Sequence, residues 1–192
     1  EVVFEGVGGP LMEAEGLAGF MVPRADAHQG EYVAPGDERL AWLTGFTGSA
    51  GFCIVLRDIA GVFVDGRYRS QVKVQVDTDA FTPIDWPETR PATWLKAHLP
   101  QGGIVGFDPW LYTPEQIAAI ETGLAGSDIR LEGRENLIDR IWPDRPAPPL
   151  GRVRVYPDDL AGDSHGAKRA RLADALKETG QEAAVITLPD SI

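Results

Sequence analysis

Two apolar runs lie so close together in this sequence that they are expected to pair as neighbouring antiparallel strands. The runs occupy residues 52–56 and 61–64, and only residues 57–60 separate them. A connection of this length suits a β-hairpin, whereas parallel strands need a crossover of roughly a dozen or more residues. Any sheet that this chain forms should therefore contain at least one antiparallel pair.

Strand-length apolar runs alternate with helical patterns along the rest of the chain up to residue 142. Further strands are expected at 17–23, 81–86, 103–107 and 128–131, and helices at 38–44, 91–99, 113–124 and 136–142. Residues 67–76 are interpreted as a helix as well, although Val72, Val74 and Val76 also fit an alternating strand. Strands interleaved with helices, together with one hairpin, predict an α/β domain with a mixed sheet.

Two of the expected helices carry specific signals at their ends. Thr113 is followed three residues later by Gln116, which predicts a capping box at the start of the helix. Asp37 is expected to cap the helix at 38–44, and Gly45 is expected to end it. These signals strengthen the assignment of both helices.

Prolines gather near the end of the chain, where five of the 15 lie between residues 143 and 157. Such a density is typical of an extended linker. We therefore expect an α/β domain at residues 1–142, a Pro-rich linker at 143–162 and the start of a second, similar α/β domain at 163–192.

The last 30 residues contain the pattern of half an α/β unit. Either Asp163 or Ser164 is expected to cap a helix at 166–179, and an apolar run at 183–188 is expected to form a strand. Because the chain ends at residue 192, this second domain is expected to be cut off before it is complete.

Charge and composition narrow the class of partner. The 192 residues include 18 Lys and Arg against 29 Asp and Glu, so the formal net charge is -11. A surface that binds phosphate would work against this charge, so we expect neither nucleic acid nor a membrane as a partner. The single cysteine, Cys53, excludes an internal disulfide and is compatible with a cytoplasmic protein.

The residues that usually perform catalysis are few. The three histidines, His28, His98 and His165, lack the short spacing of a zinc site, and no cysteine lies near them. Ser49 lies in a glycine-rich segment without the Gly-x-Ser-x-Gly pattern, so it is interpreted as part of a tight turn. We therefore expect no catalytic residue and no metal ligand in this chain.

A more promising segment is Asp65-Gly66-Arg67-Tyr68, which directly follows an expected strand. Loops at strand ends are common binding positions, and the planar guanidinium of Arg67 can hold a carboxylate or a carbonyl group. Alternatively, Asp65 and Arg67 only organise the turn.

Six motifs in the same order resemble those of the Xaa-Pro aminopeptidase (aminopeptidase P) family, of the three-domain kind. They are VPRADAHQGEYVAPGDERLAWLTGFTGSAG, FVDGRY with Gln71, GFDPWLYTPEQ, NLIDRIWPDRP, LAGDSHGAKRARL and TLPDSI. The match runs from about Leu17 to Ile192. Creatinase and prolidase share the same domain plan, but the VPR...H..EY and TGF.GSAG signatures within the first motif are closer to the aminopeptidase.

The resemblance implies that this chain is the noncatalytic N-terminal, creatinase-type portion of a cytoplasmic enzyme. Such an enzyme removes the N-terminal residue from peptides with proline in second position. It uses two divalent metal ions, usually manganese, in a C-terminal catalytic domain that this chain lacks. The N-terminal portion is expected to shape the substrate cleft, to contact its own catalytic domain and to support a homodimer.

On this resemblance, Arg67 is the first candidate for a contact with bound peptide. His28, Arg24 and Glu31 come next, either as substrate contacts or as contacts to the catalytic domain. Two alternatives remain open. The chain is then either an inert stand-alone homologue that binds peptides or partners, or a fragment of a creatinase-like or prolidase-like hydrolase.

Overall fold

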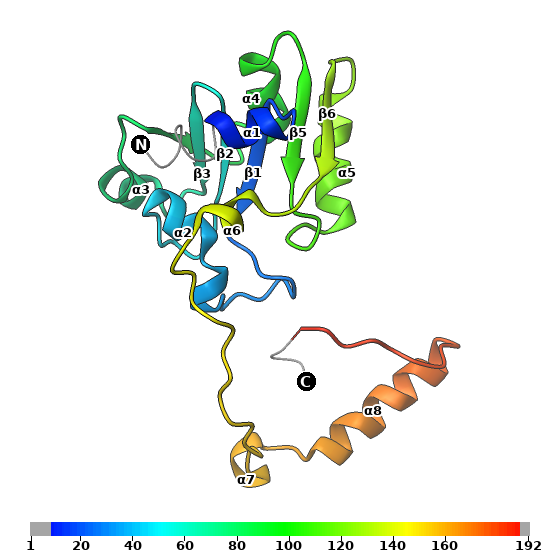
Figure 1. Cartoon of the computed structure of the whole chain (residues 1–192). Helices are drawn as coiled ribbons and strands as arrows, with labels where there is room; N and C mark the ends of the chain where they lie inside the picture. Colours follow the sequence, from blue (N-terminus) through cyan, green and yellow to red (C-terminus); the bar gives the residue numbers. More distant parts are fainter. Residues whose placement is uncertain (1–8, 189–192) are drawn as a thin grey trace. The chain divides into compact units, whose positions relative to one another are not determined.

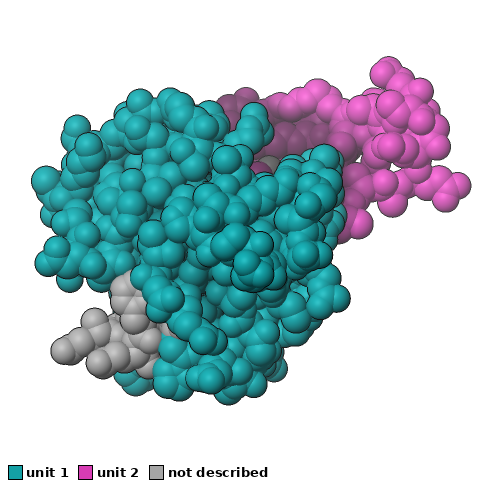
Figure 2. Space-filling view, turned by 90° about the horizontal axis from the view of Figure 1, so that it is seen from above, with its two compact units in different colours: residues 1–148 teal, residues 149–192 magenta. Residues whose placement is uncertain are grey.

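The computed structural model describes residues 9–188. The chain divides into two compact units, residues 1–148 and 149–192, which Figure 2 distinguishes by colour. The expected linker at 143–162 spans this division, and its residues 143–148 belong to the first unit. The domain boundary expected at residue 142 stays a prediction.

The first unit is built on a six-stranded mixed sheet (Figure 1), with the strand order β4-β3-β2-β1-β5-β6. Its strands are β1 (Gly19–Pro23), β2 (Phe52–Leu56), β3 (Ala60–Val64), β4 (Phe81–Asp85), β5 (Gly103–Phe107) and β6 (Ile129–Gly133). Strands β2 and β3 form the predicted hairpin, in which Val55 pairs with Ala60. The prediction of an α/β domain with a mixed sheet is therefore confirmed.

Helices cover both faces of the sheet. Since successive side chains of a strand point to opposite faces, one strand contributes to the core on each side. The helices are α1 (Met12–Ala14), α2 (Arg39–Thr44), α3 (Arg69–Gln75), α4 (Pro91–His98), α5 (Pro114–Leu124) and α6 (Leu137–Ile141), with a 3-10 turn η2 at Pro35–Asp37. Phe20 and Val22 of β1 join the core under α1, α2, α3 and α6. Met21, between them, joins the core under α4 and α5. The domain thus has three layers.

Most predicted helix signals are confirmed. Thr113 Oγ1 accepts a hydrogen bond from the Gln116 N–H at 3.2 Å, and Gln116 Oε1 accepts one from the Thr113 N–H at 2.8 Å. Gly45 ends α2 with a left-handed φ of 78°. The segment interpreted as a helix despite its alternating valines is α3, in which Val72 is buried.

The capping role predicted for Asp37 is wrong. Asp37 ends the 3-10 turn η2, and Glu38 takes the N-cap position of α2 without capping it through its side chain. The Asp37 carboxylate instead accepts hydrogen bonds from Arg39 at 3.0 Å and from Arg145 at 3.3 Å. Two charged donors outcompete a backbone N–H for the same carboxylate.

The second unit contains α7 (Asp158–Ala161) and α8 (His165–Glu178). Of the two predicted caps, Ser164 is the one that accepts a hydrogen bond from the Ala167 N–H, at 3.2 Å. The strand predicted at 183–188 does not form, and Val185 is 88% exposed. A strand needs a partner for its ladder hydrogen bonds, and every strand among residues 9–188 belongs to the sheet of the first unit.

Candidate functional site

The carboxyl ends of five parallel strands meet at one edge of the sheet, here called the carboxyl edge. Strand β1 is parallel to β5, β5 to β6 and β3 to β4, whereas β2 is antiparallel to both of its neighbours. Arg24 follows β1, the segment 65–68 follows β3, and Trp86 follows β4. In open α/β sheets ligands bind outside the carboxyl ends of the strands, so this edge is the candidate site.

Arg67 is held in a fixed direction by its neighbours in the turn. Its Nε and Nη2 donate to the Asp65 carboxylate at 3.1 and 2.7 Å, and its guanidinium lies 5.1 Å from the ring centre of Tyr68. The side chain nevertheless remains 64% exposed. Arg67 therefore organises the turn and still keeps most of its side chain accessible to solvent.

The ion pair between Arg67 and Asp65 changes the ionisation of both groups. The hydrogen bond from Arg67 holds the pKa of Asp65 below its ordinary value. The same hydrogen bond raises the pKa of Arg67, and the negative charge of nearby Glu31 adds to this effect. At neutral pH both partners are charged, so Arg67 keeps its positive charge at the carboxyl edge, where the adjacent Asp65 carboxylate balances it.

Tyr68 links this turn to the segment before β2. Its hydroxyl and Ser49 Oγ lie 2.5 Å apart and share a hydrogen bond, which lowers the pKa of Tyr68. Ser49 lies in the connection between α2 and β2, where the sequence placed it. The tyrosine hydroxyl is its partner, and this arrangement has no histidine to act as a base, so it gives no support to a serine nucleophile.

Arg24 connects two loops of the carboxyl edge through hydrogen bonds. Its Nη1 donates to the carbonyl oxygens of Glu31 and Ser49 at 2.9 and 3.2 Å, and its Nη2 lies 3.7 Å from the Glu38 carboxylate. The side chain is only 13% exposed. Arg24 therefore positions the loops, whereas Glu31 contributes its carbonyl group here and keeps an exposed side chain.

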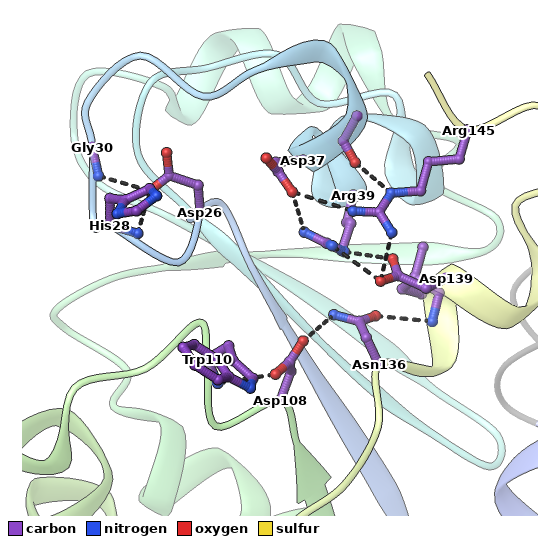
Figure 3. Close-up of polar contacts among 12 residues, drawn as sticks. Asp26, His28, Gly30, Asp37, Arg39, Asp108, Trp110, Asn136, Asp139 and Arg145 are labelled. Carbon is purple, nitrogen blue, oxygen red and sulfur yellow. Dashed lines mark hydrogen bonds and ion pairs between the residues drawn. The ribbon is translucent and has the colours of Figure 1, made fainter. Parts of the chain in front are cut away.

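His28 lies in the same loop but apart from this arrangement. Its backbone N–H and that of Gly30 both donate to Asp26 Oδ1, each at 2.9 Å (Figure 3). The imidazole is exposed, and within residues 9–188 no hydrogen bond joins it to Arg24, Glu31 or Arg67. The structure thus brings three of the four candidates together and leaves His28 separate.

Two features of the carboxyl edge were missed at the level of sequence. The first is a cavity of about 510 Å³ beside Arg24 and Ser49, between α4 and α5, which no local pattern indicates. The second is Arg39, which is only 5% exposed and lies beside the buried Leu40 and Leu43 of α2. A charged residue within an apolar helical face was an available signal for a buried ion pair.

A metal centre does not fit the residues that the structure describes. Within residues 9–188, no three or more His, Cys, Asp and Glu side chains are gathered so that they could hold a metal ion. Hard divalent cations need several such ligands at once. Across the same residues, no helix is both long and apolar enough to cross a membrane.

The fold and the carboxyl edge define a three-layer α/β domain with a single antiparallel strand inside an otherwise parallel sheet. More specifically, the chain belongs to the Creatinase/Prolidase N-terminal domain family, which it matches over residues 10–141. The resemblance identified from the sequence motifs is thereby confirmed.

Similar proteins include named Xaa-Pro aminopeptidases. The "Probable Xaa-Pro aminopeptidase P" of Neosartorya fischeri is 37% identical over 186 residues, which cover 95% of this chain and 28% of that protein. Human "Xaa-Pro aminopeptidase 2" is 39% identical over 146 residues, or 76% of this chain and 22% of that protein. The chain therefore spans less than a third of the length of these curated relatives.

Solved structures agree with this assignment. The X-prolyl aminopeptidase of Caenorhabditis elegans, described as a cytosolic enzyme with a di-nuclear active site, is 30% identical with a TM-score of 0.81. The alignment covers 91% of this chain and 29% of that one. The N-terminal domain of the peptidase PepQ from Mycobacterium tuberculosis shares the fold, with a TM-score of 0.50 and 24% identity over 68% of this chain and 91% of that one.

Proposed function

We propose that this chain is the noncatalytic N-terminal portion of a metal-dependent Xaa-Pro aminopeptidase, which releases the N-terminal residue from peptides with proline in second position. The identity of 37% to a named Xaa-Pro aminopeptidase over 95% of the chain supports this proposal. A TM-score of 0.81 to the worm X-prolyl aminopeptidase supports it as well. The proposed location is the cytoplasm, as for the worm enzyme.

The proposal assigns bond cleavage to a catalytic domain outside these 192 residues. That domain would hold the two divalent metal ions, for which manganese is the expected metal. The described residues offer no ligand set for them, so no chemical step is assigned to this portion. Its proposed tasks are to shape the substrate cleft, to contact the catalytic domain and to support a homodimer.

The observation that carries the binding role is the position of Arg67. A guanidinium that is held by Asp65 and Tyr68, yet remains 64% exposed, is prepared to donate to a carbonyl or carboxylate group of a peptide. Arg24 and Glu31 keep the adjoining loop in place, and His28 is a second, separate contact candidate. Among the four candidates, Arg67 is the one that combines rigidity with exposure, so it is the residue to test first.

The test uses the full-length gene product with Arg67→Ala. Loss of one charge-assisted hydrogen bond should lower kcat/KM for an Xaa-Pro peptide about tenfold or more, with unchanged metal content. Arg57→Ala is the matched control, because Arg57 is an exposed arginine in the hairpin turn at the opposite edge of the sheet. Unchanged kinetics in Arg67→Ala would remove Arg67 from the substrate site.

A second measurement tests the assignment of catalysis. The 192-residue chain and the full-length protein are compared for hydrolysis of an Xaa-Pro peptide with added manganese and with a chelator. Activity in the full-length protein alone is the expected result, and chelator-sensitive activity in the repurified short chain would contradict it. Creatine as a second substrate separates the aminopeptidase from a creatinase-like enzyme, and light scattering of the full-length protein tests the homodimer.

A further inference from the structure

The cavity of about 510 Å³ lies at the carboxyl edge, beside Arg24 and Ser49. Met21 of β1 and Phe52 of β2 line it from the sheet, and residues of α4 and α5 line it on either side. A volume of this size falls within the range of about 300–1,000 Å³ that is typical of small-molecule sites. The cavity is therefore large enough for a single amino-acid residue or a ligand of similar size.

One wall of the cavity is the first turn of α4. Pro91, Ala92 and Thr93, the first three residues of this helix, all line the cavity. No side chain caps the helix, whereas Thr113 caps the neighbouring α5. Pro91 has no N–H, and the Trp94 N–H donates to the Arg90 carbonyl at 3.0 Å. The N–H groups of Ala92 and Thr93 are therefore the ones without an acceptor in the helix. The helix dipole favours an anion at this end.

A free cation lies on the same wall. Arg90, the N-cap residue of α4, lines the cavity and has an exposed side chain. Within residues 9–188 its guanidinium takes part in no hydrogen bond or ion pair, in contrast to that of Arg67, which is held by Asp65. An unpaired guanidinium next to an uncapped helix start provides donors for a carboxylate on one wall of the cavity.

The rest of the lining is mainly apolar. Trp86, Leu111 and Ile120 line the cavity, and so does Tyr112, whose ring packs edge-on against Phe107 at 5.8 Å between ring centres. The Tyr112 hydroxyl is buried and has no hydrogen-bond partner within residues 9–188. The site thus combines an apolar interior with one wall that carries Arg90 and the start of α4.

We propose that this cavity binds an apolar group that carries a carboxylate, which is the chemistry of the C-terminal residue of a short peptide and of a fatty acid. The carboxylate would lie at the start of α4 and Arg90, and the apolar body between α4 and α5. Ser49 lines the cavity and is hydrogen-bonded to Tyr68, so the cavity adjoins the turn that carries Arg67. The inference needs only the 192-residue chain and does not rest on the proposed peptidase activity.

The test measures binding of three probes to the 192-residue chain by isothermal titration calorimetry. N-acetyl-L-phenylalanine and octanoate both carry the carboxylate, and N-acetyl-L-phenylalaninamide lacks it. The acid should bind at least about fivefold more tightly than the amide, because the amide cannot form the charge-assisted hydrogen bonds. Tighter binding of N-acetyl-L-phenylalanine than of octanoate would identify the C-terminal residue of a peptide as the ligand. Equal affinity for these two probes would show that the cavity binds apolar carboxylates in general.

Two variants locate the site. Arg90→Gln should remove the difference between acid and amide, whereas Arg57→Gln, with an arginine lost at the opposite edge of the sheet, should retain it. Ala119→Trp should abolish binding of all three probes, because Ala119 lines the cavity from an exposed position of α5 where a larger side chain leaves the core intact. Thermal melts confirm that each variant is folded.

Three results would overturn the proposal. The first is equal affinity for the acid and the amide, which would show that no carboxylate is recognised. The second is unchanged binding in folded Ala119→Trp, which would place the ligand elsewhere. The third is the absence of binding by any probe up to about 10 mM, an affinity too weak for a formed site.

Discussion

Arg39 donates through Nε and Nη2 to the two carboxylate oxygens of Asp139, at 2.6 and 3.0 Å, although the two residues are 100 positions apart in the sequence. Arg39 begins α2, and Asp139 lies in α6 (Figure 3). Burial opposes the charge of Arg39, but its hydrogen bonds and the charges of Asp139 and Asp37 raise the pKa of this guanidinium. The pair therefore stays ionised and joins the two helices.

Arg145 extends this ion pair to the segment after α6. Its Nη1 lies 2.8 Å from the Asp139 carboxylate, and its Nε donates to the Gly36 carbonyl at 2.6 Å. Gly36 is buried, and a Cβ placed there would lie 2.4 Å from the carbonyl oxygen of Pro146. These contacts explain why residues 143–148 belong to the first unit although their prolines suggested a linker.

We predict that Asp139→Asn destabilises the domain markedly. The substitution removes the carboxylate that Arg39, with a side chain 6% exposed, holds through two hydrogen bonds, and leaves Asp37 as the charged partner that Arg39 and Arg145 share. Loss of hydrogen bonds to a buried charge should lower the free energy of unfolding by about 2 kcal/mol. Urea denaturation measures the change. Glu121→Gln, which removes a carboxylate from the exposed face of α5, is the control and should have an effect within about 0.5 kcal/mol. Equal effects of the two variants would contradict a special role for Asp139.

The position of the domain boundary gives a second prediction. A chain that ends after Pro148 should unfold in one cooperative transition, since it retains the contacts of Arg145. A chain that ends after Trp142 should fold as well, but with a free energy of unfolding lower by about 1–2 kcal/mol, because those contacts are absent. Calorimetry of both chains measures the difference. Equal melting temperatures would show that residues 143–148 act only as a linker, and a noncooperative melt of the shorter chain would place the boundary beyond residue 142.

The features that could be predicted from the sequence are those encoded by neighbouring residues. The hairpin follows from the four residues between two apolar runs, and the capping box follows from Thr113 and Gln116. The predicted strand at 183–188 failed because an apolar run does not by itself supply a ladder partner. The position of Arg67 at a strand end was likewise readable from one segment.

Features assembled from distant segments could not be predicted in the same way. The contact between Arg39 and Asp139 joins residues far apart in the chain, and neither residue carries a local sign of its partner. The cavity beside Arg24 depends on how α4 and α5 pack against the sheet and each other. Sequence patterns specify the faces of these helices, but the space left between them is a result of packing.

The ion pair between Asp65 and Arg67 gives a prediction about pH. The pKa of Asp65 is lowered in the folded protein, so this carboxylate stabilises the fold at pH values above its unfolded pKa. That contribution is lost as the pH falls through the folded pKa, in the acid range. The carboxyl carbon of Asp65, followed by NMR during acid titration, should therefore titrate below the ordinary value for aspartate. In Arg67→Ala its pKa should return towards that value, and an unchanged pKa would show that another group holds it down.

The unpartnered hydroxyl of Tyr112 gives the last prediction. This hydroxyl is buried, and within residues 9–188 no group forms a hydrogen bond with it. Burial raises the pKa of Tyr112, so the phenol is neutral at all physiological pH values. Its removal in Tyr112→Phe costs no hydrogen bond and relieves an unsatisfied polar group. The free energy of unfolding should therefore stay constant or rise by about 1 kcal/mol in urea denaturation.

Tyr68→Phe, which removes a hydroxyl that is bonded to Ser49, is the comparison and should lower the free energy of unfolding. A loss of stability of more than about 1 kcal/mol in Tyr112→Phe would show that the hydroxyl has a partner in solution.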